Sequence, residues 1–386
     1  MIPYGRQEIS REDIETVIEI LKSDWLTQGP MVPAFEQTLA QKMNAMFAVA
    51  VNSATSALHI ACLALDLRHG DWLWTSPNTF VASANCGLYC GAHVDFVDID
   101  PLTYNMSVES LAVKLDQAEK IGALPKVVIP VHFAGQSCDM ESIHHLSKRY
   151  GFKIIEDASH AIGGLYKGKP IGSCEYSDIT VFSFHPVKVI TSGEGGMALT
   201  NQVFLAEKMQ SLRSHGITRN SEKMQYRPHG GWYYEQIDLG FNYRMTDIQA
   251  ALGLSQLKRL EQFVKRRHQI ASKYNNALRS LPLILPFQRQ DVYSAFHLYV
   301  IQVDQEQSPI NRDVLFNRLR EEEIGVNVHY IPVHTQPYYQ QRNFKKNQFI
   351  EAEKYYSNAL SLPIFSALAD DAQQKIISVL EKALQK

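Results

Sequence analysis

The sequence predicts an α/β protein with a mostly parallel central sheet and a smaller α+β domain at the C-terminal end. Up to residue 200, short β-rich runs alternate with helical stretches, and several of these runs are apolar on both faces, as in sheets that helices cover on each side. Beyond residue 245 a long amphipathic helix and a mixed pattern follow. We therefore predict two domains, residues 1–250 and residues 251–386.

The first elements are two helices and then a series of strands. Ser10 is expected to cap the first helix, with Asp13 at its third position and apolar residues at helical spacing behind it. The second helix is expected over residues 33–43. The β-rich runs cover residues 47–51, 72–76, 94–98, 126–133, 153–157, 179–184 and 196–200.

The C-terminal part begins with a helix that Thr246 caps, and we predict it to be continuous over residues 247–267. A strand over 296–303, a helix over 312–322 and a strand over 325–331 are expected after it. The domain boundary is therefore expected inside the long helix.

Composition limits the class of protein. The chain has 386 residues, a formal net charge of −2 and no long basic run, which argues against nucleic-acid binding. The N-terminus has no hydrophobic signal core, and no apolar run reaches the length of a membrane span. The five cysteines form no CxxC pair, so we expect reduced thiols, no metal site and a cytoplasmic location.

A phosphate site is predicted where "NSATSALHIA", residues 52–61, leaves a strand and opens a helix. Free backbone N–H groups and the helix dipole converge at Ala54, Thr55 and Ser56 and can bind a phosphate. The alternative is plain capping of the helix by Ser53 or Thr55. Neither GxxxxGK[ST] nor GxGxxG occurs in the chain, which excludes the two common nucleotide-binding loops.

Two ionisable residues follow strands of the same sheet. Asp157 ends the run "KIIED", where it can cap a turn or pair with a cationic ring nitrogen, and His160 comes three residues later, where it can bind or simply pack. Lys188 lies in "SFHPVKVITSGEGG", either as a solvated surface charge or as an amine whose pKa desolvation lowers. A phosphate site, then Asp, then Lys is the chain order of pyridoxal 5'-phosphate enzymes of the aspartate-aminotransferase fold, fold type I.

Several segments carry a closer resemblance. The chain resembles the nucleotide-sugar aminotransferases of the DegT/StrS type in "LTQGP", "NSATSAL", "SPNTFVASAN", "EDASHAIG", "SFHPVKVITSGEGG", "LRSHGI" and "NYRMTDIQAALGLSQL". Within that family, "GGWYYEQIDLGFNYR" and "GVNVHYIPVH" look most like the UDP-4-amino-4,6-dideoxy-N-acetyl-β-L-altrosamine transaminases of pseudaminic acid biosynthesis. A sister branch that dehydrates sugars carries His where this chain has Lys188, so the lysine favours amino transfer.

The resemblance implies roles for individual residues. Lys188 would bind the cofactor covalently and move protons, Asp157 would hold the pyridinium nitrogen, and His160 would lie beside the ring. Phe80 would stack on the ring, although an aromatic residue there could equally be core. The cofactor phosphate would be bound by Ala54, Thr55 and Ser183 of one chain and by Asn242 of the partner subunit.

The resemblance also implies a sugar-nucleotide site. Arg244 is expected to contact a phosphate, with a surface salt bridge as the alternative. The basic region around Arg213 could also bind the diphosphate. Ala54, Ser183 and Asn242 would also reach the substrate. The other lining positions are Tyr4, Asp24, Trp25, Leu26, Thr27, Asn327, Val328, His329 and Tyr330.

The expected reaction is amination of a UDP-linked 4-keto-6-deoxy-N-acetylhexosamine with L-glutamate as donor, in a homodimer with shared active sites. Another 4-keto sugar, linked to UDP or TDP, remains an alternative. A second alternative, from another class, is a non-catalytic nucleotide-sugar-binding or regulatory protein in which Lys188 is structural.

Overall fold

The fold is built around one seven-stranded sheet with helices on both faces. The structure is a computed structural model that describes residues 1–384. Strand order in the sheet is β1-β9-β8-β5-β4-β2-β3, and only β9 runs against the others. The strands are β1 Phe47–Val51, β2 Trp72–Thr75, β3 His93–Phe96, β4 Val127–Ile129, β5 Lys153–Asp157, β8 Ile179–Ser183 and β9 Gly196–Thr200.

The two faces of this sheet have separate hydrophobic cores. Alternate residues of a strand point to opposite faces, so Ala48 and Ala50 join one core and Val49 and Val51 the other. One face is covered by α2 Met31–Met43, α5 Val108–Ile121, α6 Met140–Tyr150 and α8 Asp247–Leu257, and the other by α3 Ala54–Ala64, α4 Ala82–Tyr89 and α7 Val203–Arg213. The predicted α/β class with a mostly parallel sheet is confirmed.

A smaller α+β unit follows. Its three-stranded antiparallel sheet has the order β12-β14-β15 and packs with three helices around a core of its own. These elements are α9 Leu260–Leu278, β12 Leu283–Ile284, β14 Tyr299–Val303, α10 Arg312–Glu321, β15 Ala359–Leu362 and α13 Asp370–Leu384. Division of the chain at residues 250 and 251 stays a prediction, and this point falls inside α8.

The remaining elements are short. Two-residue strands form small pairings at the surface, and three turns of 3-10 helix lie at Phe133–Gly135, Ser221–Lys223 and Val333–Thr335. The others are β6 Leu165–Tyr166, β7 Lys169–Pro170, β10 Ile217–Thr218, β11 Glu235–Gln236, β13 Val292–Tyr293, α11 Pro337–Gln340 and α12 Ile350–Asn358. Within residues 1–384, no helix is long and apolar enough to cross a membrane.

Three predicted elements differ from the structure. The helix predicted over 247–267 is interrupted at Lys258 and Arg259, where Arg259 leaves helical geometry and its guanidinium binds the carboxylates of Glu8 and Asp13. The strand predicted over 126–133 ends at Ile129, because Pro130 has no N–H to continue the ladder. No strand forms over 325–331, where the backbone makes a single bridge, between Asn327 and Ser361.

The first helix, α1 Arg11–Lys22, is anchored by a buried acid rather than by apolar side chains. The capping box of Ser10 and Asp13 is present as predicted. Asp13 is fully buried and also accepts hydrogen bonds from Ser255 and Gln256 of α8, at 2.6 and 2.7 Å. Ile14, in contrast, is 52% exposed. Asp13 is thus the one fully buried residue of α1, with Thr16, Val17 and Ile20 partly buried beside it, while Ile14, Ile18 and Leu21 are exposed.

We predict that Asp13→Ala lowers the free energy of unfolding by about 2–4 kcal/mol, because it removes several hydrogen bonds and one of the two carboxylates that pair with the Arg259 guanidinium. Urea denaturation of the two proteins measures the change. Glu12→Ala is the matched control in the same turn, where an exposed pair with Lys258 contributes at most about 1 kcal/mol. Equal losses in the two variants would contradict the anchoring role of Asp13.

Candidate active site

The predicted site residues collect at the carboxyl edge of the large sheet. Strand β5 ends at Asp157, β8 ends at Ser183, and β1 leads directly into α3, which begins at Ala54. Because these three strands run in the same direction, their last residues meet at one edge. Lys188 lies in the connection between β8 and β9, at the same edge.

The start of α3 has the geometry of an anion site. Ser53 is the N-cap, and its Oγ accepts the N–H of Ser56 at 3.1 Å. Ser53 therefore caps the helix, which is the alternative that the sequence allowed. The first-turn N–H groups of Ala54 and Thr55 still have no intrahelical partners. Gly196 of β9 packs against this turn so closely that an added Cβ would lie 2.5 Å from the Ala54 nitrogen.

The carboxylate of Asp157 is buried, with 5% of the residue exposed. Its Oδ2 accepts the hydroxyl of Ser83 at 2.6 Å, and its Oδ1 accepts the N–H of Ser159 at 3.1 Å. The second bond is the turn-capping contact that the sequence allowed. Two donors thus stabilise the anion while each oxygen keeps a lone pair for a further donor.

Lys188 is held by protein that removes most of its contact with water. Burial lowers the pKa of its amine from 10.5 to about 8, against the opposing charge of Asp157, which raises it. The surface-charge alternative does not fit a lysine in this setting. A large fraction of the amine is therefore neutral near pH 8, which is the form that acts as nucleophile and base.

Three buried histidines surround Lys188. Burial and the charge of Lys188 lower the pKa of His329 to about 3 and that of His160 well below its ordinary value. The pKa of His297 is also lowered well below its ordinary value, by burial and by neighbouring positive charges that include Lys188. All three imidazoles are therefore neutral near pH 7.

The segment 327–330 closes over this group from the small domain. Tyr330 Oη lies 3.0 Å from His160 Nε2, and its backbone N–H donates to Asn78 Oδ1 at 3.2 Å. His329 Nδ1 lies 2.8 Å from the Ser361 hydroxyl, and its ring centroid is 5.5 Å from that of Tyr4. The hydrogen bond from the Tyr330 N–H to Asn78 helps to hold this segment, which forms no strand.

Phe80 is 59% exposed, with its ring centroid 6.4 Å from that of Tyr330, so it is not a core residue. It therefore remains available to stack on a bound ring.

The remaining predicted residues lie at the periphery. Residues 24–27 and Asn242 are exposed, and the backbone of Asn242 bridges to Ser214, the residue that follows α7. Arg244 bridges to Val51, and no carboxylate forms an ion pair with it within residues 1–384, so the salt-bridge alternative is not realised.

The expectation for Arg213 is wrong. Its guanidinium forms an ion pair with Glu36 and donates to the carbonyl of Ala50 at 2.7 Å, with 17% of the side chain exposed. These contacts hold the end of α7 against β1 and α2. The arginine is thus engaged inside the fold and is not free to bind a diphosphate.

Sequence reasoning missed the roles of Ser83, Asn78 and His297. Ser83 and Asn78 lie in the segment "SPNTFVASAN", but their partners are Asp157 and Tyr330, far away in the chain. No local pattern signals such a pairing. His297 is also placed against His160, with ring centroids 4.4 Å apart, only by the packing of β14 onto the large domain.

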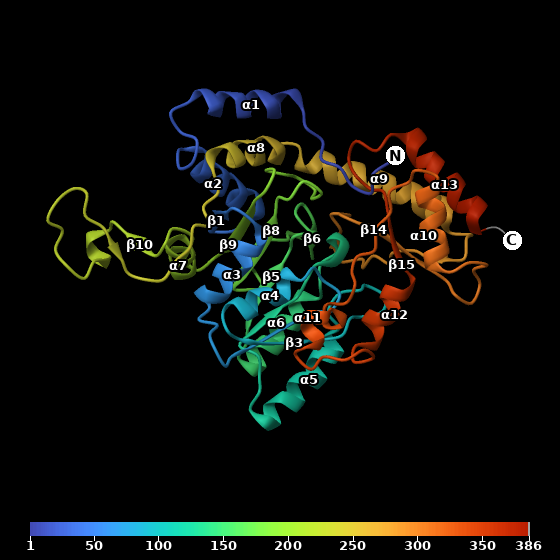
Figure 1. Cartoon of the computed structure of the whole chain (residues 1–386), viewed down its shortest axis with the longest axis horizontal. Helices are drawn as coiled ribbons and strands as arrows, with labels where there is room; N and C mark the ends of the chain where they lie inside the picture. Colours follow the sequence, from blue (N-terminus) through green and yellow to red (C-terminus); the bar gives the residue numbers. More distant parts are fainter. Residues whose placement is uncertain (385–386) are drawn as a thin grey trace.

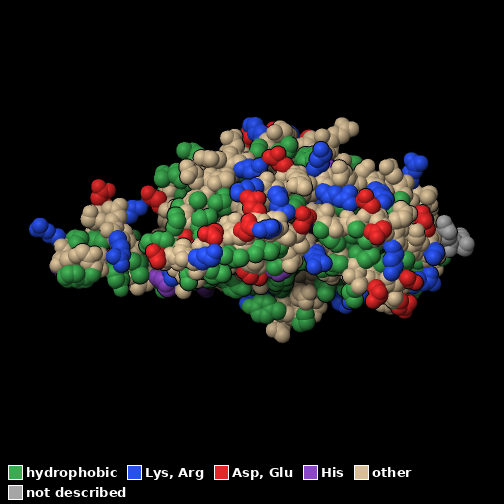
Figure 2. Space-filling model, turned by 90° about the horizontal axis from the view of Figure 1, so that it is seen from above, with side chains coloured by type: hydrophobic (Ala, Val, Ile, Leu, Met, Phe, Trp, Pro, Cys, Tyr) green, Lys and Arg blue, Asp and Glu red, His purple; other side chains and the backbone are tan. Residues whose placement is uncertain are grey.

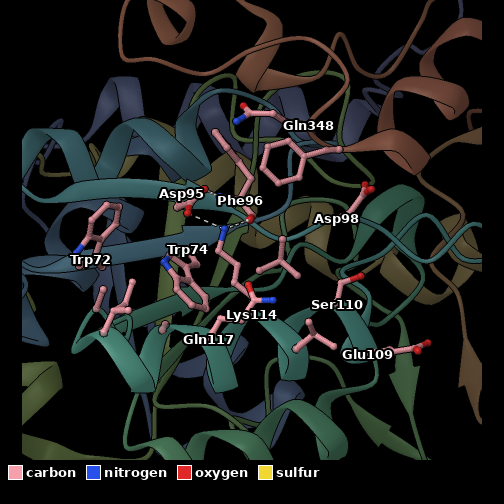
Figure 3. A pocket seen from close by; sticks show the side chains of 16 residues that line it. Trp72, Trp74, Asp95, Phe96, Asp98, Glu109, Ser110, Lys114, Gln117 and Gln348 are labelled. Carbon is pink, nitrogen blue, oxygen red and sulfur yellow. Dashed lines mark hydrogen bonds and ion pairs between the residues drawn. The ribbon is translucent and has the colours of Figure 1, made fainter.

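A separate cavity of about 620 Å³ lies between β2, β3 and α5, and neither Lys188 nor Asp157 lines it (Figure 3). Its central cation, Lys114, is bound to Asp95 and to the Phe96 carbonyl, both at 2.6 Å. Asp98 accepts the first N–H groups of α12. The charged groups Lys114, Asp95 and Asp98 are thus paired with protein, and the site of interest is the carboxyl edge of the sheet.

The fold and this site define a class of protein. The site has a buried carboxylate, an amine of lowered pKa and an anion site at one edge of a seven-stranded sheet with a single reversed strand. This combination is typical of the fold type I pyridoxal phosphate enzymes. The chain is a member of the DegT/DnrJ/EryC1/StrS aminotransferase family, whose description matches residues 7–381. It is therefore a sugar aminotransferase.

Three relatives illustrate the match. The spore coat polysaccharide biosynthesis protein SpsC of Bacillus subtilis is 42% identical over 98% of this chain and 96% of its own. The sugar aminotransferase Spr1654 of Streptococcus pneumoniae has a TM-score of 0.89 and 30% identity, with 99% of each chain covered, and has been solved in PMP and PLP forms. Helicobacter pylori PseC, an aminotransferase of pseudaminic acid biosynthesis, also has a TM-score of 0.89 and 30% identity over 99% of each chain.

The cofactor of the family is pyridoxal 5'-phosphate, and the residues present fit it. The free N–H groups of Ala54 and Thr55 suit its phosphate, Asp157 suits its ring nitrogen, and the amine of Lys188 suits its aldehyde. Within residues 1–384, no group of three or more His, Cys, Asp or Glu side chains is arranged to hold a metal ion.

We predict that Lys188 in the cofactor-free protein reacts with acetic anhydride with a pH midpoint near 8, well below the ordinary value of 10.5. The rate rises with pH because only the deprotonated amine reacts. Competitive labelling followed by mass spectrometry measures it. Asp157→Asn should move the midpoint lower still, since it removes the charge that favours the ammonium form; an ordinary midpoint would contradict the buried setting of Lys188.

Proposed function

We propose that this protein converts a UDP-linked 4-keto-6-deoxy-N-acetylhexosamine to its 4-amino sugar, with L-glutamate as amino donor, in pseudaminic acid biosynthesis. The observation that carries the proposal is the cluster of Lys188, whose amine has a lowered pKa, with the buried, neutral imidazoles of His160 and His329, beside Asp157 and the segment 327–330. Similarity to PseC, and the form of the segments that resemble that branch, support the sugar. Five free cysteines fit the reducing cytoplasm, where we place the reaction.

The residues divide the work as follows. When bound, pyridoxal phosphate supplies an electron sink for the reacting carbon. Lys188 would hold the cofactor, and its amine would take and return protons as general base and acid. Asp157 would pair with the ring nitrogen and keep its proton there. Ala54, Thr55 and Ser183 would bind the phosphate.

The sugar nucleotide is proposed to lie between the segment 327–330 and the exposed residues 24–27. Tyr4, Trp25 and Tyr330 offer apolar faces, while Asn327 and His329 offer polar groups for the hydroxyl and acetamido substituents. Because Arg213 is bound to Glu36, Arg244 is the basic residue that we assign to the diphosphate. With the sugar bound in this position, its carbonyl would lie near Lys188 and away from water.

A second candidate substrate is favoured by one comparison. SpsC, named for spore coat polysaccharide biosynthesis, shares 42% of its residues with this chain, compared with 30% for PseC. A different 4-keto sugar linked to UDP or TDP therefore remains the alternative. The site residues near Lys188 would act in the same way on either sugar.

The acting unit is proposed to be a homodimer with shared active sites. The outer side of α1 and the loop after it exposes Ile14, Ile18, Leu21, Trp25 and Leu26, and hydrophobic side chains gather on that face in Figure 2. Residues 217–240, with β10 and β11, project from the body as an arm (Figure 1). Trp232 on this arm is 71% exposed. A second copy of the chain would cover both surfaces.

We expect the purified enzyme to aminate UDP-linked 4-keto-6-deoxy-N-acetylhexosamine at C-4 with glutamate. A panel of UDP and TDP 4-keto sugars in both ring configurations, analysed by mass spectrometry and NMR of the products, provides the measurement. Preference for the D-configured UDP sugar would refute the pseudaminic assignment, and use of TDP sugars alone would also refute the nucleotide. Amination of none of these sugars would refute the proposed substrate class.

We predict that Lys188→Ala abolishes turnover and that Asn242→Ala lowers it strongly, because the two residues serve one site from different chains. Mixed dimers of the two variants should regain activity, since one of their two sites contains both native residues. Differently tagged chains allow the mixed dimers to be isolated and assayed. Isolated mixed dimers that stay inactive would count against a shared site.

A further inference from the structure

We infer that Ser83 is a positioning residue for Asp157, and that its hydrogen bond favours the shared proton on the ring nitrogen of the cofactor over the same proton on the carboxylate. This inference rests on the proposed pairing of Asp157 with that nitrogen. It concerns a residue of α4 that lies 74 positions from Asp157 in the chain.

The hydrogen bond from Ser83 is the shorter of the two that the Asp157 side chain accepts. Ser83 is fully buried, and its Oγ lies 2.6 Å from Asp157 Oδ2. A serine hydroxyl has one hydrogen, and the other acceptors in reach are the Phe80 carbonyl at 3.4 Å and Thr79 Oγ1 at 2.8 Å. The charged oxygen at the shortest distance takes the hydrogen, and the Thr79 hydroxyl then donates to Ser83.

The backbone fixes both partners. Asp157 is held by hydrogen bonds of its N–H to Pro130 and of its carbonyl to the N–H of His132. Ser83 is the second residue of α4, whose N-cap, Val81, provides no side-chain cap. The positive end of the helix therefore lies beside the carboxylate, and the hydroxyl of Ser83 extends this effect to it.

The chemical consequence follows from competition for one proton. A hydrogen bond donated to a carboxylate favours its charged form and lowers its proton affinity. Without the Ser83 hydroxyl, the carboxylate would compete better for the shared proton, and the ring nitrogen would carry that proton for a smaller fraction of the time. The cofactor would then be a weaker electron sink at each step that needs one.

The test uses the holoenzyme reconstituted with pyridoxal phosphate that carries nitrogen-15 in its ring. In Ser83→Ala, the nitrogen-15 titration should reach a protonated plateau that lies closer to the shift of the unprotonated ring, because the loss of the hydrogen bond moves the shared proton toward Asp157. We expect kcat to fall about tenfold or more, while KM for glutamate changes little. Ser83→Thr keeps the hydroxyl and should restore both the plateau and kcat.

The matched control is Ser255→Ala. The Ser255 hydroxyl also donates at 2.6 Å to a buried carboxylate, that of Asp13, on the outer side of the large domain. It should lower the Tm as Ser83→Ala does and leave the nitrogen-15 titration unchanged. A purely structural role for Ser83 would give the control's result, a lower Tm with an unchanged titration, and would overturn the inference.

Two further variants complete the test. If Ser83→Ala does not fold, Ser83→Cys keeps the volume with a much weaker donor, and the same change in the nitrogen-15 plateau is expected. An unchanged plateau would overturn the inference. Asp157→Asn separates this inference from the proposal on which it rests. If Asp157→Asn shifts the nitrogen-15 signal and Ser83→Ala does not, only the role of Ser83 fails; if neither does, the assignment of Asp157 fails as well.

Discussion

A buried carboxylate is the constraint on which the active site depends. Taking the charge of Asp157 out of water is costly unless donors surround it. The structure supplies the Ser83 hydroxyl and the Ser159 N–H, and Lys188 lies close enough for the carboxylate to raise its pKa. These contacts require that β5 and β8 end where α4 begins, and the parallel sheet brings these points together.

The same burial sets the charge state of the surrounding groups. Lys188 would be fully protonated in water near pH 8, yet the loss of solvent makes much of it neutral. A positive charge at that amine, and the low polarity around it, keep the imidazoles of His160 and His329 neutral. The site therefore combines one fixed anion with several neutral donors and acceptors. Such an arrangement suits proton transfer to and from an uncharged sugar.

A single chain leaves part of its apolar surface without a partner. Helix α1 is attached to α8 through Asp13, Ser255 and Arg259, and this polar attachment turns Ile14 and Leu21 outward. The arm over residues 217–240 also extends beyond the body of the chain. Both features have a simple physical explanation if a second copy covers them, and residues 24–27 then lie at a boundary between subunits.

The sequence by itself determined the class of fold, the family and the positions of Lys188, Asp157 and the start of α3, because each follows from a local pattern at the end of a strand. Capping of α1 by Ser10 and of α8 by Thr246 was predictable for the same reason. Only the tertiary structure decided which distant side chains meet. In the folded chain Ser83 donates a hydrogen bond to Asp157, and Arg213 pairs with Glu36. The long helix is interrupted at Arg259, and residues 325–331 form no strand. These outcomes depend on contacts between residues far apart in the chain, whose energies no local periodicity records.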